Sequence, residues 1–173
     1  MNLSKKNNGI LYISCGPPGS GKSTFLKEMK EEGEVIVSRD EIRFSLLKPG
    51  EEYFAHEKEA YNKFLQTIKQ YINSGVNVYA DATHLTEKSR YTLIKALKNR
   101  GCFPREINAI YFIVPLDICK ERNELRRGTP AYVPIWQVEK MFTTYVIPNK
   151  TEGFSNIWKI DSEGDVEIML EGD

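Results

Sequence analysis

Nine consecutive residues carry the clearest chemical pattern in this sequence: Gly16-Pro17-Pro18-Gly19-Ser20-Gly21-Lys22-Ser23-Thr24. Gly16, Gly21, Lys22 and Ser23 fit the spacing G-x-x-x-x-G-K-[ST] of a phosphate-binding loop. Glycines allow backbone N–H groups to turn toward phosphate oxygens at angles that a Cβ would resist, and a following helix adds unpaired N–H groups. In such loops the lysine contacts the β- and γ-phosphates, and the serine hydroxyl ligates Mg²⁺. The nine residues therefore predict a binding site for the phosphates of a nucleotide and for Mg²⁺.

A second cluster lies in the segment 38–43, where Asp40 and Arg43 are three residues apart. On a helical turn this spacing places both side chains on one face. A phosphoryl acceptor needs a carboxylate that takes its hydroxyl proton and a cation that holds any phosphate it carries. The structural alternative is a helix cap at Asp40 and a solvated ion pair at Arg43. The position beside the phosphate-binding loop favours the catalytic interpretation.

Asp81 is predicted to end the third strand. In phosphate-loop enzymes such a carboxylate often orders Mg²⁺ or its water, so Asp81 joins Ser23 as a candidate metal-binding residue. A turn-forming aspartate at a strand end is the structural alternative, and both interpretations stay open. His84, three residues on, is interpreted as a loop residue rather than as a ligand.

Three arginines, Arg122, Arg126 and Arg127, crowd a predicted helix end directly before Gly128-Thr129-Pro130. Arginines at a helix C-terminus complement the helix dipole. They also stabilise charge on a transferring phosphoryl group, which makes them candidates for binding the nucleotide. Glycine and proline would let the segment around 122–133 act as a hinged lid. We favour the functional interpretation.

Strand and helix patterns alternate along the chain and must position these clusters. The expected strands are 10–15, 35–37, 76–80, 106–114 and 157–160. The expected helices are about 22–32, a short one ending near 47, 51–73, 87–100, one after Pro115, and 134–145. This order predicts an α/β fold with a mainly parallel sheet and helices on both faces. Ligands then sit beyond the carboxyl ends of the strands, where residues 16–24, 38–43 and 81–84 are expected.

The 173 residues suit one domain covering 1–173, with frayed polar termini. Apolar residues make up 40% and charged residues 28%, an ordinary globular composition. Lys plus Arg and Asp plus Glu number 24 each, which argues against wrapping a long nucleic acid but permits local arginines to grip one end. The three dispersed cysteines are expected in the core, as are Trp136 and Phe142. No stretch is apolar enough to span a membrane, and we expect a cytoplasmic protein.

The segments GPPGSGKST, SRDEIR, DATH and RNELRRGTPAYVPIWQVEKM together resemble the kinase domain of phage-type polynucleotide kinases. The resemblance covers roughly residues 9–147, and its specificity lies in RDEIR followed by the R-G-T-x-x-x-V-P segment. It implies a P-loop kinase fold with a helical lid. It also implies a 5′-end-healing reaction that moves the ATP γ-phosphate to a 5′-hydroxyl of RNA or DNA. No phosphatase motif occurs, so a separate phosphatase or ligase is the implied partner in repair.

On the donor side, the resemblance implies that Lys22 and Ser23 contact phosphate and metal. Arg127, in Arg-Gly-Thr, resembles the essential lid arginine on the donor phosphates, and Arg122 resembles a second lid arginine. The spacing between Arg122 and Arg127 is one residue longer than in the phage enzyme. Arg126 can therefore substitute for either of them.

On the acceptor side, Asp40 resembles the family's general base on the 5′-hydroxyl. Arg43 resembles the arginine that holds the acceptor's 3′-side phosphate. Asp81 resembles the aspartate of the D-x-T-N motif. His84 stands where that motif usually has asparagine, which leaves the role of this corner open.

Two other functions remain as alternatives. A small-molecule kinase would phosphorylate the hydroxyl of a nucleoside, sugar or antibiotic, and the neutral net charge fits it slightly better. Arg43 discriminates, because a phosphate-bearing acceptor needs this cation and a neutral acceptor does not. A nucleotide-switch module is the less favoured alternative. Its guanine-binding motif N-K-x-D is matched only by Asn149-Lys150-Thr151-Glu152, in which the last residue is Glu.

Overall fold

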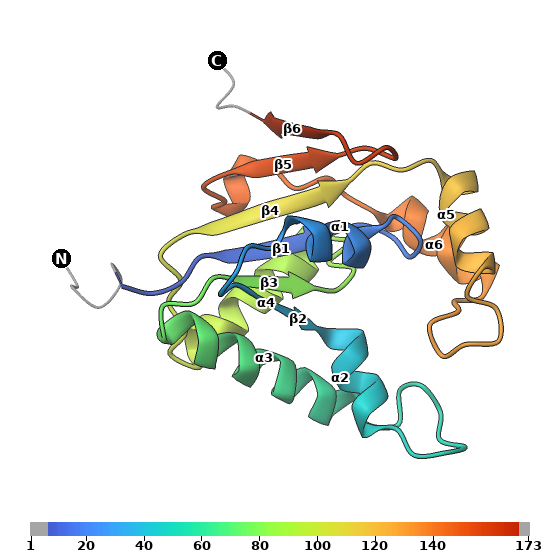
Figure 1. Ribbon diagram of the computed structural model, residues 1–173, viewed down its shortest axis with the longest axis horizontal. Helices are drawn as coiled ribbons and strands as arrows, with labels where there is room; N and C mark the ends of the chain where they lie inside the picture. Colours follow the sequence, from blue (N-terminus) through green and yellow to red (C-terminus); the bar gives the residue numbers. More distant parts are fainter. Residues whose placement is uncertain (1–6, 170–173) are drawn as a thin grey trace.

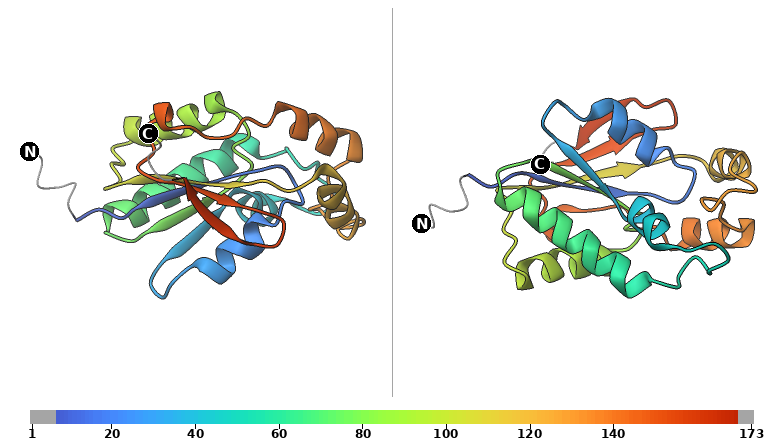
Figure 2. Two further views of the ribbon diagram at one scale, coloured as in Figure 1. Left: turned by 90° about the horizontal axis from the view of Figure 1, so that it is seen from above. Right: turned by 60° about the horizontal axis from the view of Figure 1, so that its bottom comes forward.

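The computed structural model describes residues 7–169, which form one six-stranded sheet with helices on both sides (Figure 1, Figure 2). The strands are β1 (Leu11–Cys15), β2 (Val35–Ser38), β3 (Val78–Asp81), β4 (Ile107–Phe112), β5 (Ile157–Ile160) and β6 (Val166–Met169). Their order across the sheet is β2-β3-β1-β4-β5-β6, and every neighbouring pair is parallel except β5 and β6. The expected α/β class with a mainly parallel sheet is confirmed.

The helices follow the strands in turn. They are α1 (Lys22–Met29), α2 (Arg39–Leu46), α3 (Glu57–Asn73), α4 (Glu87–Asn99), α5 (Leu116–Glu124), α6 (Ile135–Thr144) and the 3₁₀ turn η2 (Lys150–Glu152). Helix α1 lies on one side of the sheet and α3 and α4 lie on the other (Figure 2). No helix among residues 7–169 is long and apolar enough to cross a membrane.

Strand β1 lies at the centre of the sheet and is buried along its whole length. Its side chains alternate between two hydrophobic clusters. Leu11 and Ile13 pack with residues of α3 and α4, whereas Tyr12 packs with Leu26 of α1. A strand covered on both faces is typical of a parallel sheet and explains the continuous apolar sequence of β1. The cysteines are buried as expected.

Helix boundaries were predicted less well than helix positions. Helix α1 ends at Met29 instead of continuing to residue 32, because Lys30 adopts an extended backbone. Helix α3 begins at Glu57 rather than near residue 51. Residues 48–56 form turns instead, since the Glu51 carboxylate accepts a hydrogen bond from the backbone N–H of Lys48. Trp136, expected in the core, is 65% exposed.

The C-terminal segment is more ordered than the sequence predicted. Residues 166–169, predicted as part of a frayed acidic tail, form the antiparallel edge strand β6, which pairs with β5. The sequence Asp161–Asp165 makes the connecting turn, where Asp161 accepts backbone hydrogen bonds from Glu163 and Asp165. The remaining terminal residues, 1–6 and 170–173, lie outside the described part of the chain.

Candidate active site

The loop between β1 and α1 has the backbone of a phosphate-binding site. Gly19 and Gly21 have φ angles of 80° and 88°, a left-handed conformation that residues with a Cβ rarely adopt. A Cβ on Gly19 would also lie 2.2 Å from the carbonyl oxygen of Cys119 in α5. Gly21 is the N-cap of α1 and offers no capping side chain, so the helix N-terminus is available to an anion.

Lys22 is buried and points into this loop. Its ammonium group donates hydrogen bonds to the carbonyl oxygens of Gly16 at 2.9 Å and Pro17 at 3.0 Å. Burial lowers the pKa of Lys22, and the nearby Asp81 carboxylate opposes this shift. All the hydrogen-bond acceptors of the ammonium are neutral oxygens, so a phosphate would supply the negative charge that they lack.

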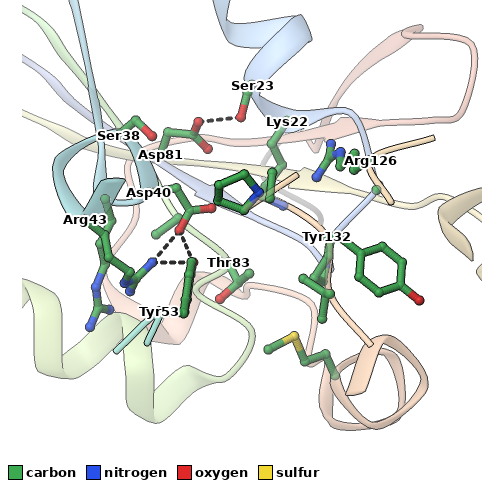
Figure 3. Close-up of a pocket in the computed structure, with 18 of the residues that line it drawn as sticks. Lys22, Ser23, Ser38, Asp40, Arg43, Tyr53, Asp81, Thr83, Arg126 and Tyr132 are labelled. Carbon is green, nitrogen blue, oxygen red and sulfur yellow. Dashed lines mark hydrogen bonds and ion pairs between the residues drawn. The ribbon is translucent and has the colours of Figure 1, made fainter. Parts of the chain in front are cut away.

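Ser23 and Asp81 meet beside the loop, although 58 residues separate them in sequence. The Ser23 hydroxyl donates a hydrogen bond of 2.6 Å to Oδ2 of Asp81 (Figure 3). Strand order brings this about, because β3, which ends at Asp81, pairs in parallel with β1, and β1 leads through the loop into the first turn of α1 with Ser23. A hydroxyl and a carboxylate oxygen fit Mg²⁺, which is usually held by one or two protein groups together with substrate phosphates and water. Among the described residues, no group of three His, Cys, Asp or Glu side chains could hold a metal alone.

Asp40 and Arg43 lie on one face of α2, as their spacing predicts. Arg43 NH1 donates to Oδ1 of Asp40, and Arg43 Nε donates to Glu57 at 2.8 Å. Burial disfavours the charge on Arg43, but the hydrogen bond to Glu57 and the charges of Tyr53, Glu57 and Asp40 together outweigh it and raise the pKa of the guanidinium. The side chain of Asp40 is 61% exposed and that of Arg43 only 6%. Asp40 is thus accessible from solvent and has a fixed direction.

One cavity of about 420 Å³ joins the two clusters, and Figure 3 shows both at its border. The predicted site residues that line it are Gly19, Gly21, Lys22, Ser23, Asp40, Arg43, Asp81 and Arg126. Gly16, Ser20, Thr24, Arg122 and Arg127 do not line it, although the first three belong to the loop or to the first turn of α1.

The three arginines have different surroundings. Arg126 lines the cavity. Arg122 lies close to the loop, with NH1 3.3 Å from where a Cβ on Gly21 would be, and donates to the carbonyl of Ser162. Arg127 is exposed and forms a two-pronged hydrogen bond with Glu124 at 2.7 and 2.9 Å. In this structure Arg126 is therefore the arginine of the predicted lid segment that faces the cavity.

Several cavity residues were not among the site residues predicted from the sequence. Glu57, Thr83, Tyr132 and Tyr53 all line the cavity. Tyr53 donates to Asp40 at 2.6 Å, and Glu57 holds both Arg39 and Arg43. The helix predicted from residue 51 would have placed Tyr53 differently. For Glu57, the one available signal was that a buried Arg43 needs a carboxylate partner, and the sequence did not say which one.

His84 is a buried loop residue, as expected, but it has a specific contact. Its Nδ1 donates a hydrogen bond of 2.8 Å to the carbonyl of Ser14, and its φ of 41° is in the left-handed region. The backbone N–H of Gly16 donates to the carbonyl of Thr83 at 2.9 Å. The segment after β3 is therefore attached to the start of the phosphate-binding loop at two points.

We expect His84 to make the protein less stable in acid. Burial lowers the pKa of His84 from 6.5 to about 4. The unfolded chain therefore binds more protons than the folded one between these values, and the free energy of unfolding falls as pH falls through this window, by about 3 kcal/mol in all. Urea unfolding at several pH values measures the slope. His84→Asn should flatten the dependence of the unfolding free energy on pH, because the amide does not titrate in this range. Asparagine is chosen because it tolerates the positive φ at this position. The control His56→Asn, in the α2–α3 connection, should keep the slope; an equal slope in both variants would contradict this assignment.

Comparison with known proteins gives three kinds of similarity. A family model described as an AAA domain matches residues 11–148. Transcription factor bHLH140 of Arabidopsis thaliana is 28% identical over 166 residues, and the match spans 94% of this chain but only 17% of that protein's length. A chain of the Pnkp1/Rnl/Hen1 RNA repair complex superposes with a TM-score of 0.64 at 24% identity, over 83% of this chain and 46% of that one.

A gluconokinase from Sinorhizobium meliloti superposes with a TM-score of 0.56 at 17% identity, over 90% of this chain and 83% of that one. At sequence identities this low, the superpositions show a similarity of fold alone. Together with the strand order and the loop after β1, they identify a P-loop kinase fold.

Proposed function

This chain belongs to the AAA-domain family whose model it matches over residues 11–148, and from that premise we propose that it is a polynucleotide 5′-hydroxyl kinase. The reaction moves the γ-phosphate of ATP to the 5′-hydroxyl of an RNA or DNA end. The observation that carries the proposal is the single cavity shared by Lys22, Asp40 and Arg43. One side of it suits a triphosphate, and the other offers a carboxylate and a cation to a hydroxyl acceptor.

On the donor side, the loop from Gly16 to Thr24 binds the phosphates, and Lys22 neutralises charge on the β- and γ-phosphates. Ser23 and Asp81 hold Mg²⁺, which supplies further positive charge to the phosphoryl group when bound. Arg126 reaches the donor phosphates from the lid. Arg127 takes this role only after it leaves Glu124, with which it is paired in the structure.

On the acceptor side, Asp40 removes the proton of the 5′-hydroxyl as this oxygen attacks the γ-phosphorus. Arg43 binds the phosphate on the 3′ side of the terminal nucleotide. Catalysis in this scheme comes mainly from positioning and from charge stabilisation of an in-line transfer. The 5′-phosphorylated end that the reaction makes is a substrate for a ligase.

Transfer of label tests the function directly. The purified protein is incubated with γ-labelled ATP, Mg²⁺ and a short oligonucleotide bearing a 5′-hydroxyl, and a 5′-phosphorylated copy serves as control. We expect label only on the 5′-hydroxyl strand, and matched RNA and DNA strands then give the preference. Absence of label on both strands, with ATP binding intact, would refute a nucleic-acid acceptor.

A second candidate, a small-molecule kinase, is favoured by the charge balance around Asp40. Two cations, Arg39 and Arg43, face two anions, Asp40 and Glu57, in this part of the cavity. Because Arg43 already pairs with both carboxylates, a neutral hydroxyl acceptor also fits.

To separate the two functions, nucleoside 3′-phosphates and nucleosides are compared as acceptors. Equal efficiency, expressed as kcat/KM, would support the small-molecule kinase.

A further inference from the structure

The hydroxyl of Tyr53 contacts the carboxylate of Asp40, the proposed base. It donates a hydrogen bond of 2.6 Å to Oδ1 of Asp40 and accepts one of 2.5 Å from NH1 of Arg43. Arg43 NH1 also donates to the same Asp40 oxygen, so the three groups form a closed triangle (Figure 3). Burial and the hydrogen bond to Asp40 raise the pKa of Tyr53, so the phenol keeps the proton that it donates.

These are the contacts that an acceptor hydroxyl needs before transfer. A general base must accept a hydrogen bond from the hydroxyl that it deprotonates, at about 2.6–3.2 Å. Tyr53 makes this bond within the cavity that contains Lys22 and Ser23. Its hydroxyl and an acceptor hydroxyl bound to Oδ1 would exclude each other.

The Tyr53 ring also covers Arg43. The guanidinium carbon lies 4.4 Å from the ring centroid of Tyr53 and 5.4 Å from that of Phe54. Phe54 packs edge-on against Tyr53 at 4.7 Å. Both aromatic residues belong to the α2–α3 connection, which extends away from the sheet (Figure 1) and holds its shape through local turns around Lys48 and Glu51. Movement of this connection would uncover Asp40 and Arg43 together without disturbing the core.

Given the proposed role of Asp40 as base, on which this inference rests, we infer that Tyr53 is a specificity-determining residue that distinguishes an acceptor from water. Its hydroxyl occupies the acceptor position on Asp40 until a bound acceptor displaces it. The Asp40 side chain is 61% exposed with Tyr53 in place, so water reaches the carboxylate, and the Tyr53 hydroxyl blocks only the position on Oδ1. Without this hydroxyl, water would occupy that position as well. In the reaction that Tyr53 prevents, a water oxygen bonds to the γ-phosphorus, the bond from this phosphorus to the β–γ bridging oxygen breaks to release ADP, and the water proton goes to Asp40.

Tyr53→Phe keeps the ring and removes only the hydroxyl. We expect ATP hydrolysis without acceptor to rise about tenfold, because a hydrogen bond to a charged group no longer holds the position closed. The KM for a 5′-hydroxyl oligonucleotide should fall by a similar factor, because the acceptor no longer displaces the phenol. The kcat for transfer should stay within about twofold of wild type. Tyr91→Phe is the matched control, since Tyr91 is 61% exposed on α4 and should change none of these values.

The double variant Asp40→Asn/Tyr53→Phe tests whether the additional hydrolysis uses Asp40 as its base. The increase in hydrolysis should disappear, because the base that takes the water proton is absent. Unchanged hydrolysis in Tyr53→Phe would overturn the inference, as would an increase that persists in the double variant. A lower kcat with unchanged KM would instead make Tyr53 a positioning residue for Asp40 and would also overturn it.

Hydrolysis without acceptor is measured independently of which acceptor the enzyme uses. If wild-type protein labels no oligonucleotide, the proposed function fails, while the comparison of hydrolysis rates still decides the role of Tyr53. If the oligonucleotide is labelled and hydrolysis does not change in Tyr53→Phe, the proposed function stands and the role of Tyr53 fails.

Discussion

Replacement of Asp40 by asparagine is expected to reduce transfer to a 5′-hydroxyl by about 10²–10⁴-fold, the usual contribution of a general base. The amide has nearly the same shape and can still accept hydrogen bonds from Tyr53 and Arg43, but it cannot take a proton. ATP binding should stay close to wild type, because Asp40 lies on the acceptor side of the cavity and has no hydrogen bond to the phosphate-binding loop. Steady-state kinetics gives kcat, and calorimetry gives the Kd for ATP.

Glu41→Gln is the matched control for Asp40→Asn. Glu41 is the next residue on α2, is exposed, and does not line the cavity, so the same loss of one carboxylate should leave kcat unchanged. Turnover near the wild-type value in Asp40→Asn would remove Asp40 as the base. Equal losses in the two variants would point to a general electrostatic effect instead.

Replacement of Arg90 by methionine is expected to lower the free energy of unfolding by about 3–5 kcal/mol. Arg90 is fully buried in α4 and forms a two-pronged ion pair with Glu152 at 2.7 and 2.8 Å. Its NH1 donates to the carbonyls of His84 and Val146. The variant would leave the Glu152 carboxylate, 4% exposed, without its partner. Calorimetry should show a fall in Tm of roughly 10 °C.

Two controls separate loss of the buried pair from loss of a charge. Lys159→Met breaks the exposed pair with Glu167 at the sheet edge and should leave Tm nearly unchanged, because solvent screens exposed ion pairs. Arg90→Met/Glu152→Gln removes both charges of the buried pair and should recover much of the lost stability. A fall in Tm for Arg90→Met no larger than that for Lys159→Met would contradict the importance of the buried pair. Because Arg90 holds the carbonyl of His84, we also expect its loss to disturb the segment that contains Asp81 and Thr83.

The sequence alone determined the parts of this protein whose chemistry is local. The loop after β1 was predicted because its glycines, two of which adopt a left-handed backbone, lie with Lys22 and Ser23 within nine consecutive residues. The shared face of Asp40 and Arg43 follows from helical geometry, and it is present. The N-cap of the same helix is Ser38, whose side chain accepts from the backbone N–H of Glu41. The alternation of strands and helices was sufficient for the fold class.

Tertiary structure decided the contacts between residues that are far apart in sequence or within irregular connections. The meeting of Ser23 with Asp81 depends on the pairing of β3 with β1, which no local pattern contains. Strand β6 was missed because all of its side chains are exposed, so that pairing with β5 rather than burial in the core holds it. Tyr53 was missed because residues 48–56 form turns, whereas a helix was predicted from residue 51. Only the backbone of these turns directs the Tyr53 hydroxyl to Asp40. The side chains of Arg126 and Arg127 differ in direction for the same reason, since their positions depend on how the segment after α5 folds over the cavity.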